Sequence, residues 1–241
     1  MKRIIGLAML CLVTGFVQAQ EKNTINDPNA RERKVGTFSG VSVSGSIELH
    51  ITQDPSTRVL VSSSDADWTD KIETFLKNDV LYIRMKKDSD NWNWSGRNRR
   101  FRAYVSSPVI KSIESSGSGR TIIEGRINSE ELEITSSGSG SIDGIIDVNK
   151  LSFEKSGSGQ SRLSGRATYA SIETSGSGSF VGPDLIVEKC SISTSGSGSV
   201  EVTVNKEIAA STSGSGNIRL HGEALISDIS TSGSGRLKRM K

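Results

Sequence analysis

The tetrapeptide Ser-Gly-Ser-Gly occurs seven times in the second half of the chain and constrains the fold more than any other feature. Self-similarity at a fixed period is typical of repeat architectures, in which one small structural unit stacks on the next. The copies follow one another at intervals of 18 to 21 residues and begin at Ser116, Ser137, Ser156, Ser175, Ser195, Ser213 and Ser232. A period near 19 residues therefore describes one structural repeat.

Apolar side chains recur at fixed distances from each tetrapeptide, three and five residues before it and five residues after its first serine. The residues between these positions are mostly polar or small, an alternation that is typical of β-strands with one buried face. The three columns are Ile113, Ile134, Phe153, Ile172, Ile192, Ala210 and Ile229; Lys111, Leu132, Leu151, Ala170, Cys190, Ile208 and Ser227; and Thr121, Ile142, Ser161, Phe180, Val200, Ile218 and Leu237. Each repeat thus predicts two or three short strands.

One such repeat cannot bury its apolar face alone, so the repeats must stack. The fold that fits is all-β, a parallel β-solenoid with about 19 residues per coil and coils roughly 4.8 Å apart. Glycine in the tetrapeptide suits a tight corner, and the aligned serines and the preceding threonines predict hydroxyl ladders along the axis. The alternative is a flat Ser/Thr array that binds a regular surface such as ice or crystalline polysaccharide.

The first residues have the features of a secretory signal peptide, since two basic residues precede an apolar run and cleavage is expected after Ala19. Residues 20–34 are polar and predict a flexible lead-in. After cleavage, 28 basic and 27 acidic residues remain, which gives no argument for nucleic acid as a partner. One cysteine also remains, Cys190, and its place in an inward column predicts a small core residue.

Residues 35–110 predict an N-terminal part built from degenerate β-strands. Residues 38–53 alternate like a degenerate coil, further strands are expected at residues 58–62, 71–76 and 80–85, and residues 65–78 include one expected helical turn. The expected organisation is a signal peptide (1–19), a lead-in (20–34), an N-terminal β part (35–110) and the repeat solenoid (111–241).

These segments, in this order, resemble the "putative auto-transporter adhesin, head GIN domain" family of secreted proteins from Bacteroidetes-type bacteria. The resemblance rests on residues 38–53, 71–74 and 78–83 and on the tetrapeptide array, and it covers residues 35–241. It implies a right-handed β-helix-like fold and an adhesin role, with no catalytic residues to carry over.

Patterns of catalytic or metal-binding residues are weak in this sequence. Polysaccharide-cleaving enzymes need clustered carboxylates, whereas the acidic residues of the array fall at different offsets, and His50 and His221 are far apart. The glycine-rich repeat lacks the aspartate of calcium-binding solenoids, and no Cys/His cluster has zinc spacing. We therefore expect a non-enzymatic protein without cofactor or metal; a polysaccharide-acting enzyme on a β-helix is the alternative.

One stretch departs from the repeat in length, aromaticity and charge: residues 86–102, KKDSDNWNWSGRNRRFR. Exposed tryptophan stacks on sugar rings, and arginine pairs with carboxylates or phosphates. The candidate ligand-binding residues are therefore Trp92, Trp94, Arg97, Arg99 and Arg100. In the other interpretation, the tryptophans close the end of the solenoid core and the arginines stay solvated.

The sequence thus predicts an exported, adhesin-like binding or scaffolding protein of the periplasm, the outer cell surface or the extracellular space. The expected partner is a cell-surface glycan or an envelope protein; neither nucleic acid nor an integral membrane segment is expected. An unpaired strand at the end of the stack also predicts self-association unless charge opposes it. Such charge is present in Arg236, Lys238, Arg239 and Lys241.

Overall fold

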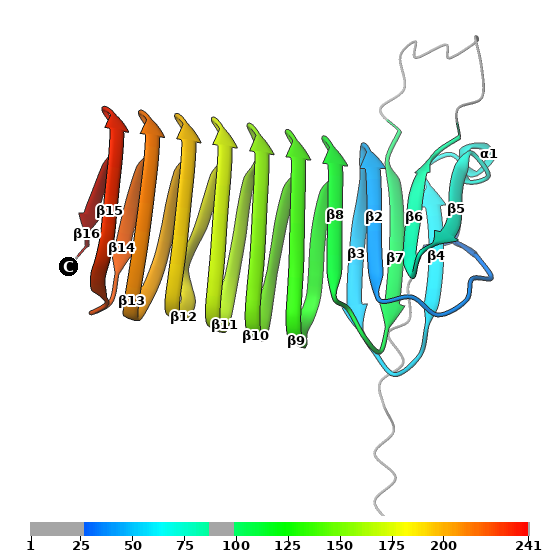
Figure 1. The fold of residues 1–241 in the computed structure, drawn as a ribbon. Helices are drawn as coiled ribbons and strands as arrows, with labels where there is room; N and C mark the ends of the chain where they lie inside the picture. The colour runs from blue at the N-terminus through cyan, green and yellow to red at the C-terminus, as the bar shows by residue number, and fades with distance from the viewer. Residues whose placement is uncertain (1–26, 87–98, 241) are drawn as a thin grey trace, which may run out of the picture.

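The structure is a computed structural model that describes residues 27–86 and 99–240. Its strands wind into a parallel β-solenoid that is elongated along the coil axis, with a cap of antiparallel strands at the N-terminal end (Figure 1). Neighbouring coils pair residues that are one repeat apart, such as Ile142 with Ser161 and Phe153 with Ile172. The predicted all-β solenoid with one repeat per coil is confirmed.

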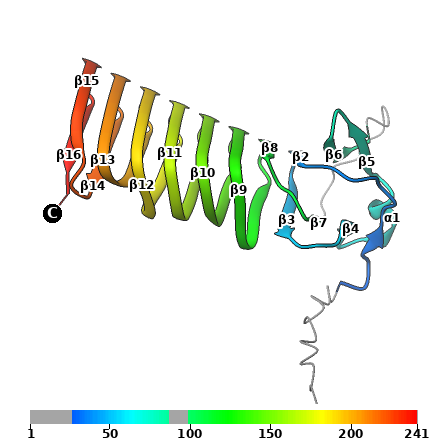
Figure 2. The ribbon, with the colours of Figure 1, turned by 60° about the horizontal axis from the view of Figure 1, so that its bottom comes forward.

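Each coil of the array is one long strand that bends at mid-length, so its two halves belong to two facing sheets (Figure 2). These strands are β9 (Arg120–Gly138), β10 (Ser141–Gly157), β11 (Gln160–Gly176), β12 (Ser179–Gly196) and β13 (Ser199–Gly214). We call the sheet of their first halves sheet 1 and the sheet of their second halves sheet 2. At the C-terminal end, sheet 1 continues through β14 (Asn217–His221) and β16 (Arg236–Arg239), and sheet 2 through β15 (Leu225–Gly233).

Residues 38–53 form a coil of the same kind, as their alternation predicts. β2 (Gly40–Gly45) pairs in parallel with β8 (Ser112–Gly117) in sheet 2, and β3 (Ile47–Gln53) pairs in parallel with β9 in sheet 1. This coil therefore stacks directly on the array, although residues 54–111 separate the two in sequence.

Beyond this coil the N-terminal cap begins. Its elements are β1 (Arg31–Glu32), β4 (Arg58–Ser63), α1 (Ala66–Thr69), β5 (Ile72–Lys77), β6 (Val80–Met85) and β7 (Phe101–Ser107). β6 and β7 still pair in parallel with β2 and β3, and the strand direction reverses beyond them. β4 runs antiparallel to β7, and β5 runs antiparallel to β6. The expected helical turn is α1, whose first turn is capped by the Asp65 side chain.

Part of the expected flexible lead-in is tied to this cap. Arg31 and Glu32 pair antiparallel with β4, and the amide of Arg33 donates to the carbonyl oxygen of Val59 at 2.8 Å. Residues 31–33 therefore have backbone partners at the edge of β4 that local composition cannot reveal. The expected signal peptide lies outside the described residues.

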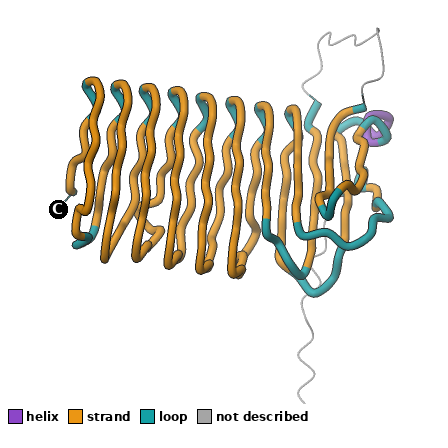
Figure 3. Tube along the Cα trace, viewed as in Figure 1, coloured by secondary structure: helices purple, strands orange, loops and turns teal. Residues whose placement is uncertain are grey.

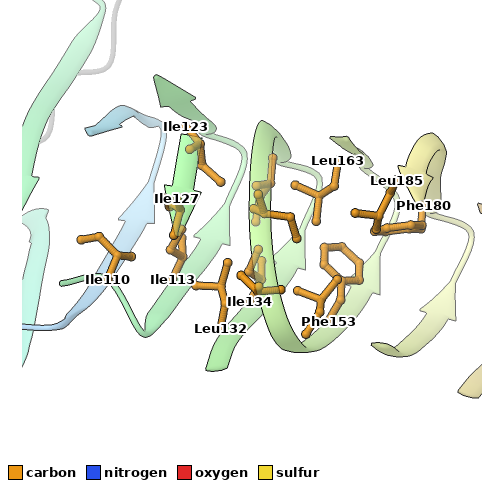
Figure 4. Packing of buried hydrophobic residues seen from close by; sticks show 14 of the residues in the cluster. Ile110, Ile113, Ile123, Ile127, Leu132, Ile134, Phe153, Leu163, Phe180 and Leu185 are labelled. Carbon is orange, nitrogen blue, oxygen red and sulfur yellow. The ribbon is translucent and has the colours of Figure 1, made fainter. Parts of the chain in front are cut away.

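The apolar residues of the predicted columns point between the two sheets from Ile113 to Ile218 (Figure 4), whereas Lys111 and Ser227, at the two ends of the second column, are exposed. The column three residues before the tetrapeptide is at most 5% exposed from Ile113 to Ala210. Cys190 is buried in its predicted column, and burial raises the pKa of its thiol to about 12. Ile229 in β15 is exposed, because β15 pairs with β13 on one side only.

Two large aromatic rings of the core meet across a coil that contributes several small side chains. Phe153 of β10 and Phe180 of β12 meet edge to face, with their ring centroids 4.7 Å apart (Figure 4). The intervening coil, β11, contributes the small buried residues Ser161, Ala167 and Ala170. This complementarity lets the core reach the close packing of protein interiors without a change in coil spacing.

One inward column is polar and lies directly before the tetrapeptide. Its buried members are Ser115, Ser136, Lys155, Thr174, Thr194 and Thr212. The expected hydroxyl ladder does not form in this column. The hydroxyls of Thr174, Thr194 and Thr212 have no hydrogen-bond partner among the described residues. Equivalent atoms of adjacent coils are roughly 4.8 Å apart, so identical rotamers do not reach the roughly 2.8 Å of a hydroxyl hydrogen bond.

Lys155 is the charged member of this column and is 1% exposed. Its ammonium group donates to the Ser136 hydroxyl at 3.1 Å and to the carbonyl oxygen of Gly140 at 3.3 Å. Both partners are neutral, and burial lowers the pKa of Lys155 below its ordinary value. A buried charge without a counter-charge costs free energy, so a neutral side chain of similar volume is expected to stabilise this coil.

Lys155→Met is expected to raise the free energy of unfolding at pH 7 by about 1–3 kcal/mol, because methionine keeps most of the volume and removes the charge. The gain should shrink at alkaline pH. Between the lowered folded-state pKa and the unfolded value of 10.5, the unfolded state binds more protons, so the stability of the unchanged chain rises with pH. Urea unfolding at pH 7 and pH 10 measures both effects. The same change at the exposed Lys206 is the control, and equal effects at both positions would contradict the prediction.

The tetrapeptide forms the corner at which one coil passes into the next (Figure 3). At each step, backbone amides of one corner donate to a glycine carbonyl of the preceding corner; for example, Ser139 and Gly140 both donate to Gly117 at 2.9 Å. Gly117 and its equivalents have positive φ angles, and an added Cβ would overlap the backbone of the preceding coil. The predicted corner role of the tetrapeptide is confirmed.

Candidate functional site

The structure describes only part of the predicted ligand-binding loop. Trp92, Trp94 and Arg97 lie outside the described residues. Arg99 is 19% exposed and lies on the cap: its Cζ is 4.2 Å from the ring centroid of Trp68 in α1, and its Nε is 3.6 Å from the Asp65 carboxylate.

Arg100, the next residue, has an exposed side chain. Its backbone holds the segment in place, because its amide donates to the Ser64 hydroxyl at 3.1 Å and its carbonyl oxygen accepts from the Ser64 amide at 3.0 Å. The two described arginines therefore have different surroundings. Arg99 is held against the cap, and Arg100 is open to a partner.

A polar network that the sequence did not indicate joins the cap to the first coils. His50 of β3 lies between two carboxylates, with Nε2 3.0 Å from Glu48 and Nδ1 2.6 Å from Glu124 of β9. Glu48 also accepts from Arg102 of β7 at 3.2 Å. Burial alone would raise the pKa of Glu48, but the contacts with His50 and Arg102 hold it below its usual value.

This network is suited to holding strands together rather than to acid–base catalysis. Both ring nitrogens of His50 face carboxylates of the protein, whereas a general base needs a nitrogen within reach of a substrate proton. The carboxylates come from the same strand and from β9, so the imidazole links two neighbouring strands of sheet 1. No local sequence motif indicates this network, because Glu124 lies beside His50 only when the coils stack.

A groove of about 380 Å³ runs along the coil axis on the outer surface of sheet 2. Each of four successive coils contributes one small side chain to its floor: Ser152, Ser171, Ser191 and Ala209. Each also contributes one long side chain to a wall: Lys150, Tyr169, Lys189 and Glu207. No pattern in the sequence indicates this groove.

The wall of the groove is balanced in charge. Lys150 lies 3.4 Å from Glu131 in the preceding coil, and Lys189 lies 3.0 Å from Glu207 in the following coil. The hydrogen bond to Glu207 raises the pKa of Lys189. Tyr169 stands between the two lysines and is 50% exposed.

Two rows of serines follow the corner on the outside. The first and the second serine of each tetrapeptide in the array are mostly exposed, whereas the side chain directly before the tetrapeptide points inward. In register, each serine lies beside its equivalent in the next coil, such as Ser156 beside Ser175. The hydroxyl array considered from the sequence therefore exists as a narrow edge, two residues wide, rather than as a flat face.

Two further findings concern the part of the chain that the structure describes. No group of three or more His, Cys, Asp or Glu residues in residues 27–86 and 99–240 is arranged to hold a metal ion. In the same residues, no helix has both the length and the apolar character needed to cross a membrane.

The fold and these surfaces define a capped, two-sheet β-solenoid whose outer faces carry long straight rows of side chains. Solenoids of this kind offer extended binding surfaces. The chain belongs to the family described as "putative auto-transporter adhesin, head GIN domain", whose model matches residues 37–224. The resemblance inferred from the sequence is confirmed.

Solved structures share the fold. A protein described as a putative adhesin from Bacteroides fragilis superposes with a TM-score of 0.79 at 24% identity, covering 88% of this chain and 96% of its own. A putative adhesin from Parabacteroides merdae has a TM-score of 0.68 at 17% identity, covering 88% and 95%. A protein described as a putative lipid binding protein from Parabacteroides distasonis has a TM-score of 0.70 at 23% identity, covering 90% and 98%. No curated protein matches the chain in sequence.

Proposed function

We propose that this chain is an exported, non-enzymatic, adhesin-like protein that binds or scaffolds a cell-surface glycan or an envelope protein. The observation that supports the proposal is the repetition of outward side chains at one coil spacing along both sheets. A long surface of this kind suits a partner that is itself extended or repetitive. The adhesin description of the family and of two structural neighbours agrees with it.

Export is part of the same proposal. The predicted signal peptide at residues 1–19 supports it, and the periplasm, the outer cell surface and the extracellular space are the compartments that such a segment allows.

Among the alternatives, the two exposed serine rows favour a binder of regular surfaces over an enzyme, because hydroxyls at constant spacing can match a repeating lattice.

The loop is the second element of the proposal: Trp92, Trp94, Arg97, Arg99 and Arg100 contact the partner. The exposed side chain of Arg100 is available for such contact, whereas Arg99, held by Asp65 and Trp68, anchors the base of the loop. Tryptophan and arginine side chains together suit a glycan that carries acidic groups.

The fluorescently labelled chain of residues 20–241 is expected to bind intact Bacteroides cells or cultured epithelial cells in flow cytometry. Changing both Trp92 and Trp94 to alanine should weaken this binding by about tenfold or more. The melting temperature should change by no more than about two degrees, since ligand-contacting residues outside the core contribute little to stability. A large loss of melting temperature would show that the tryptophans close the core instead. Absence of binding to every surface tested, or release of reducing ends from polysaccharides, would contradict the proposed function.

A further inference from the structure

We propose that the groove on sheet 2 binds an unbranched, uncharged oligosaccharide that lies along the coil axis. The inference deepens the adhesin-like function and rests on it, because it names a ligand class and a site. Tyr169 supplies the stacking surface, Ser152, Ser171 and Ser191 supply hydroxyls along the floor, and Lys150 and Lys189 flank the ring.

The shape of the groove follows from the register of the coils. Tyr169 pairs with Lys150 and Lys189, so long side chains form a continuous wall. Ser171, two residues further along the same strand, points to the same side of the sheet and pairs with Ser152 and Ser191. A row of long side chains beside a row of short ones leaves the observed volume of about 380 Å³.

The groove has two defined ends. At one end of the floor, Ser152 pairs with Glu133 of the preceding coil, and at the other end Ala209 pairs with Asp228 of the following coil. A carboxylate therefore lies beyond the small side chains at each end. The small floor spans three coil steps, or roughly 14 Å. One pyranose ring of a linear glycan is about as long as one coil step, so this length holds a short oligosaccharide with its rings in step with the coils.

The backbone of sheet 2 excludes the usual way in which a sheet binds a peptide. Peptides add as a new strand to a free sheet edge, where main-chain hydrogen bonds provide the affinity. β10, β11 and β12 already pair with a coil on both sides along the groove. The groove can therefore recognise a ligand only through side chains, which favours a ligand rich in hydroxyl groups over a polypeptide.

The chemistry of the side chains indicates a neutral sugar. The exposed ring of Tyr169 offers an apolar face on which a sugar ring can stack, and its hydroxyl can hydrogen-bond to the sugar. Serine hydroxyls both donate and accept hydrogen bonds, which matches the hydroxyl groups of a sugar. Lys150 and Lys189 are each paired with a glutamate, so the wall carries no net excess of positive charge that would select a polyanion.

Isothermal titration calorimetry with the chain of residues 20–241 tests this inference. The probes are the linear hexasaccharides of β-1,4-linked glucose, mannose and xylose, with hexagalacturonate as the charged counterpart. At least one neutral hexasaccharide should bind in a manner that depends on Tyr169, whereas any binding of hexagalacturonate, whose carboxylates suit the arginines of the loop, should be unchanged in Tyr169→Ala. Tyr169→Ala should weaken binding of the neutral hexasaccharide by about tenfold, and Ser191→Gln, which fills the floor with a polar side chain, should weaken it similarly.

Two matched variants serve as controls. Ile186→Ala truncates a similarly exposed side chain (44%) outside the groove, and Ser46→Gln enlarges an exposed serine outside the groove; both should bind like the unchanged chain. The inference is overturned if no neutral hexasaccharide binds, if Tyr169→Ala weakens the binding of hexagalacturonate as much as that of the neutral hexasaccharide, or if Tyr169→Ala behaves like Ile186→Ala. Cell binding that persists in Tyr169→Ala without any hexasaccharide binding would overturn the groove and leave the proposed function intact. Hexasaccharide binding without cell binding would support the groove and contradict the proposed function.

Discussion

Gly157→Ala is expected to unfold the solenoid or to lower its free energy of unfolding by more than about 4 kcal/mol, which is exceptional for a single substitution. Gly157 has a φ of +116°, a backbone conformation that residues with a side chain rarely adopt. An added Cβ would also overlap the carbonyl oxygen of Gly138 in the preceding coil. That carbonyl accepts the amide of Ser158 at 3.0 Å, so moving it away would break a hydrogen bond of the corner.

Alanine substitutions at two other glycines separate the effect of backbone strain from the effect of steric overlap. Gly125 has a φ of +77° but open space around its Cα, so Gly125→Ala carries only the backbone strain, about 1–2 kcal/mol. Gly159 is not among the positive-φ glycines, but its added Cβ would overlap the carbonyl of Gly140, so Gly159→Ala carries only the steric clash. Urea unfolding followed by circular dichroism ranks the three variants. If Gly157→Ala cost no more than Gly125→Ala, the corners would not be in close contact.

Deletion of residues 156–174 is expected to leave a folded, shorter solenoid, whereas deletion of residues 156–165 should abolish cooperative unfolding. The longer deletion removes one coil and joins Lys155 to Ser175, and in the intact chain Ser156 already pairs with Ser175. Every downstream column therefore keeps its position. The ten-residue deletion removes a corner and half a coil, so the remaining inward residues no longer meet their neighbours.

Nearest-neighbour stacking is the reason for this contrast, since each repeat contacts mainly the repeats beside it. The in-register deletion should lower stability by the contribution of one coil and keep a single unfolding transition in circular dichroism and calorimetry. Deletion of residues 175–194, the following coil, is the matched control and should behave in the same way, because Thr174 pairs with Thr194 and Ser175 with Ser195. Equal damage from the shorter and the longer deletion would show that one repeat does not correspond to one coil.

The architecture could be predicted because its information is local and repeated. A residue such as Ile134 or Ile172 lies three positions before a tetrapeptide, and the same offset faces the core in every middle coil. The same rule identified residues 38–53 as a coil without their distant partner strands being known. The division at residues 110 and 111 stays a prediction, as do the ligand contacts of the loop.

The details that give this solenoid its individual surfaces could not be predicted in this way. His50 meets Glu124, and Arg31 and Glu32 add to β4, because the cap brings segments together whose sequences carry no shared pattern. Lys155 occupies an inward position that its type would assign to the surface. In each case a partner that is remote in sequence decides whether the residue is buried, paired or exposed.

The sequence by itself determined the period, the corners and the inward columns, since the stacking of identical units obliges equivalent residues to lie side by side. Only the tertiary structure decided that each coil bends into two sheets, that antiparallel strands cap the N-terminal end, and that Tyr169 stands above a floor of serines between two paired lysines. The physical reason is that a groove is a relation between side chains of different coils. The depth of the groove depends on how long side chains and short side chains line up when the coils stack. A single repeat holds only its own side chains and so cannot show this alignment.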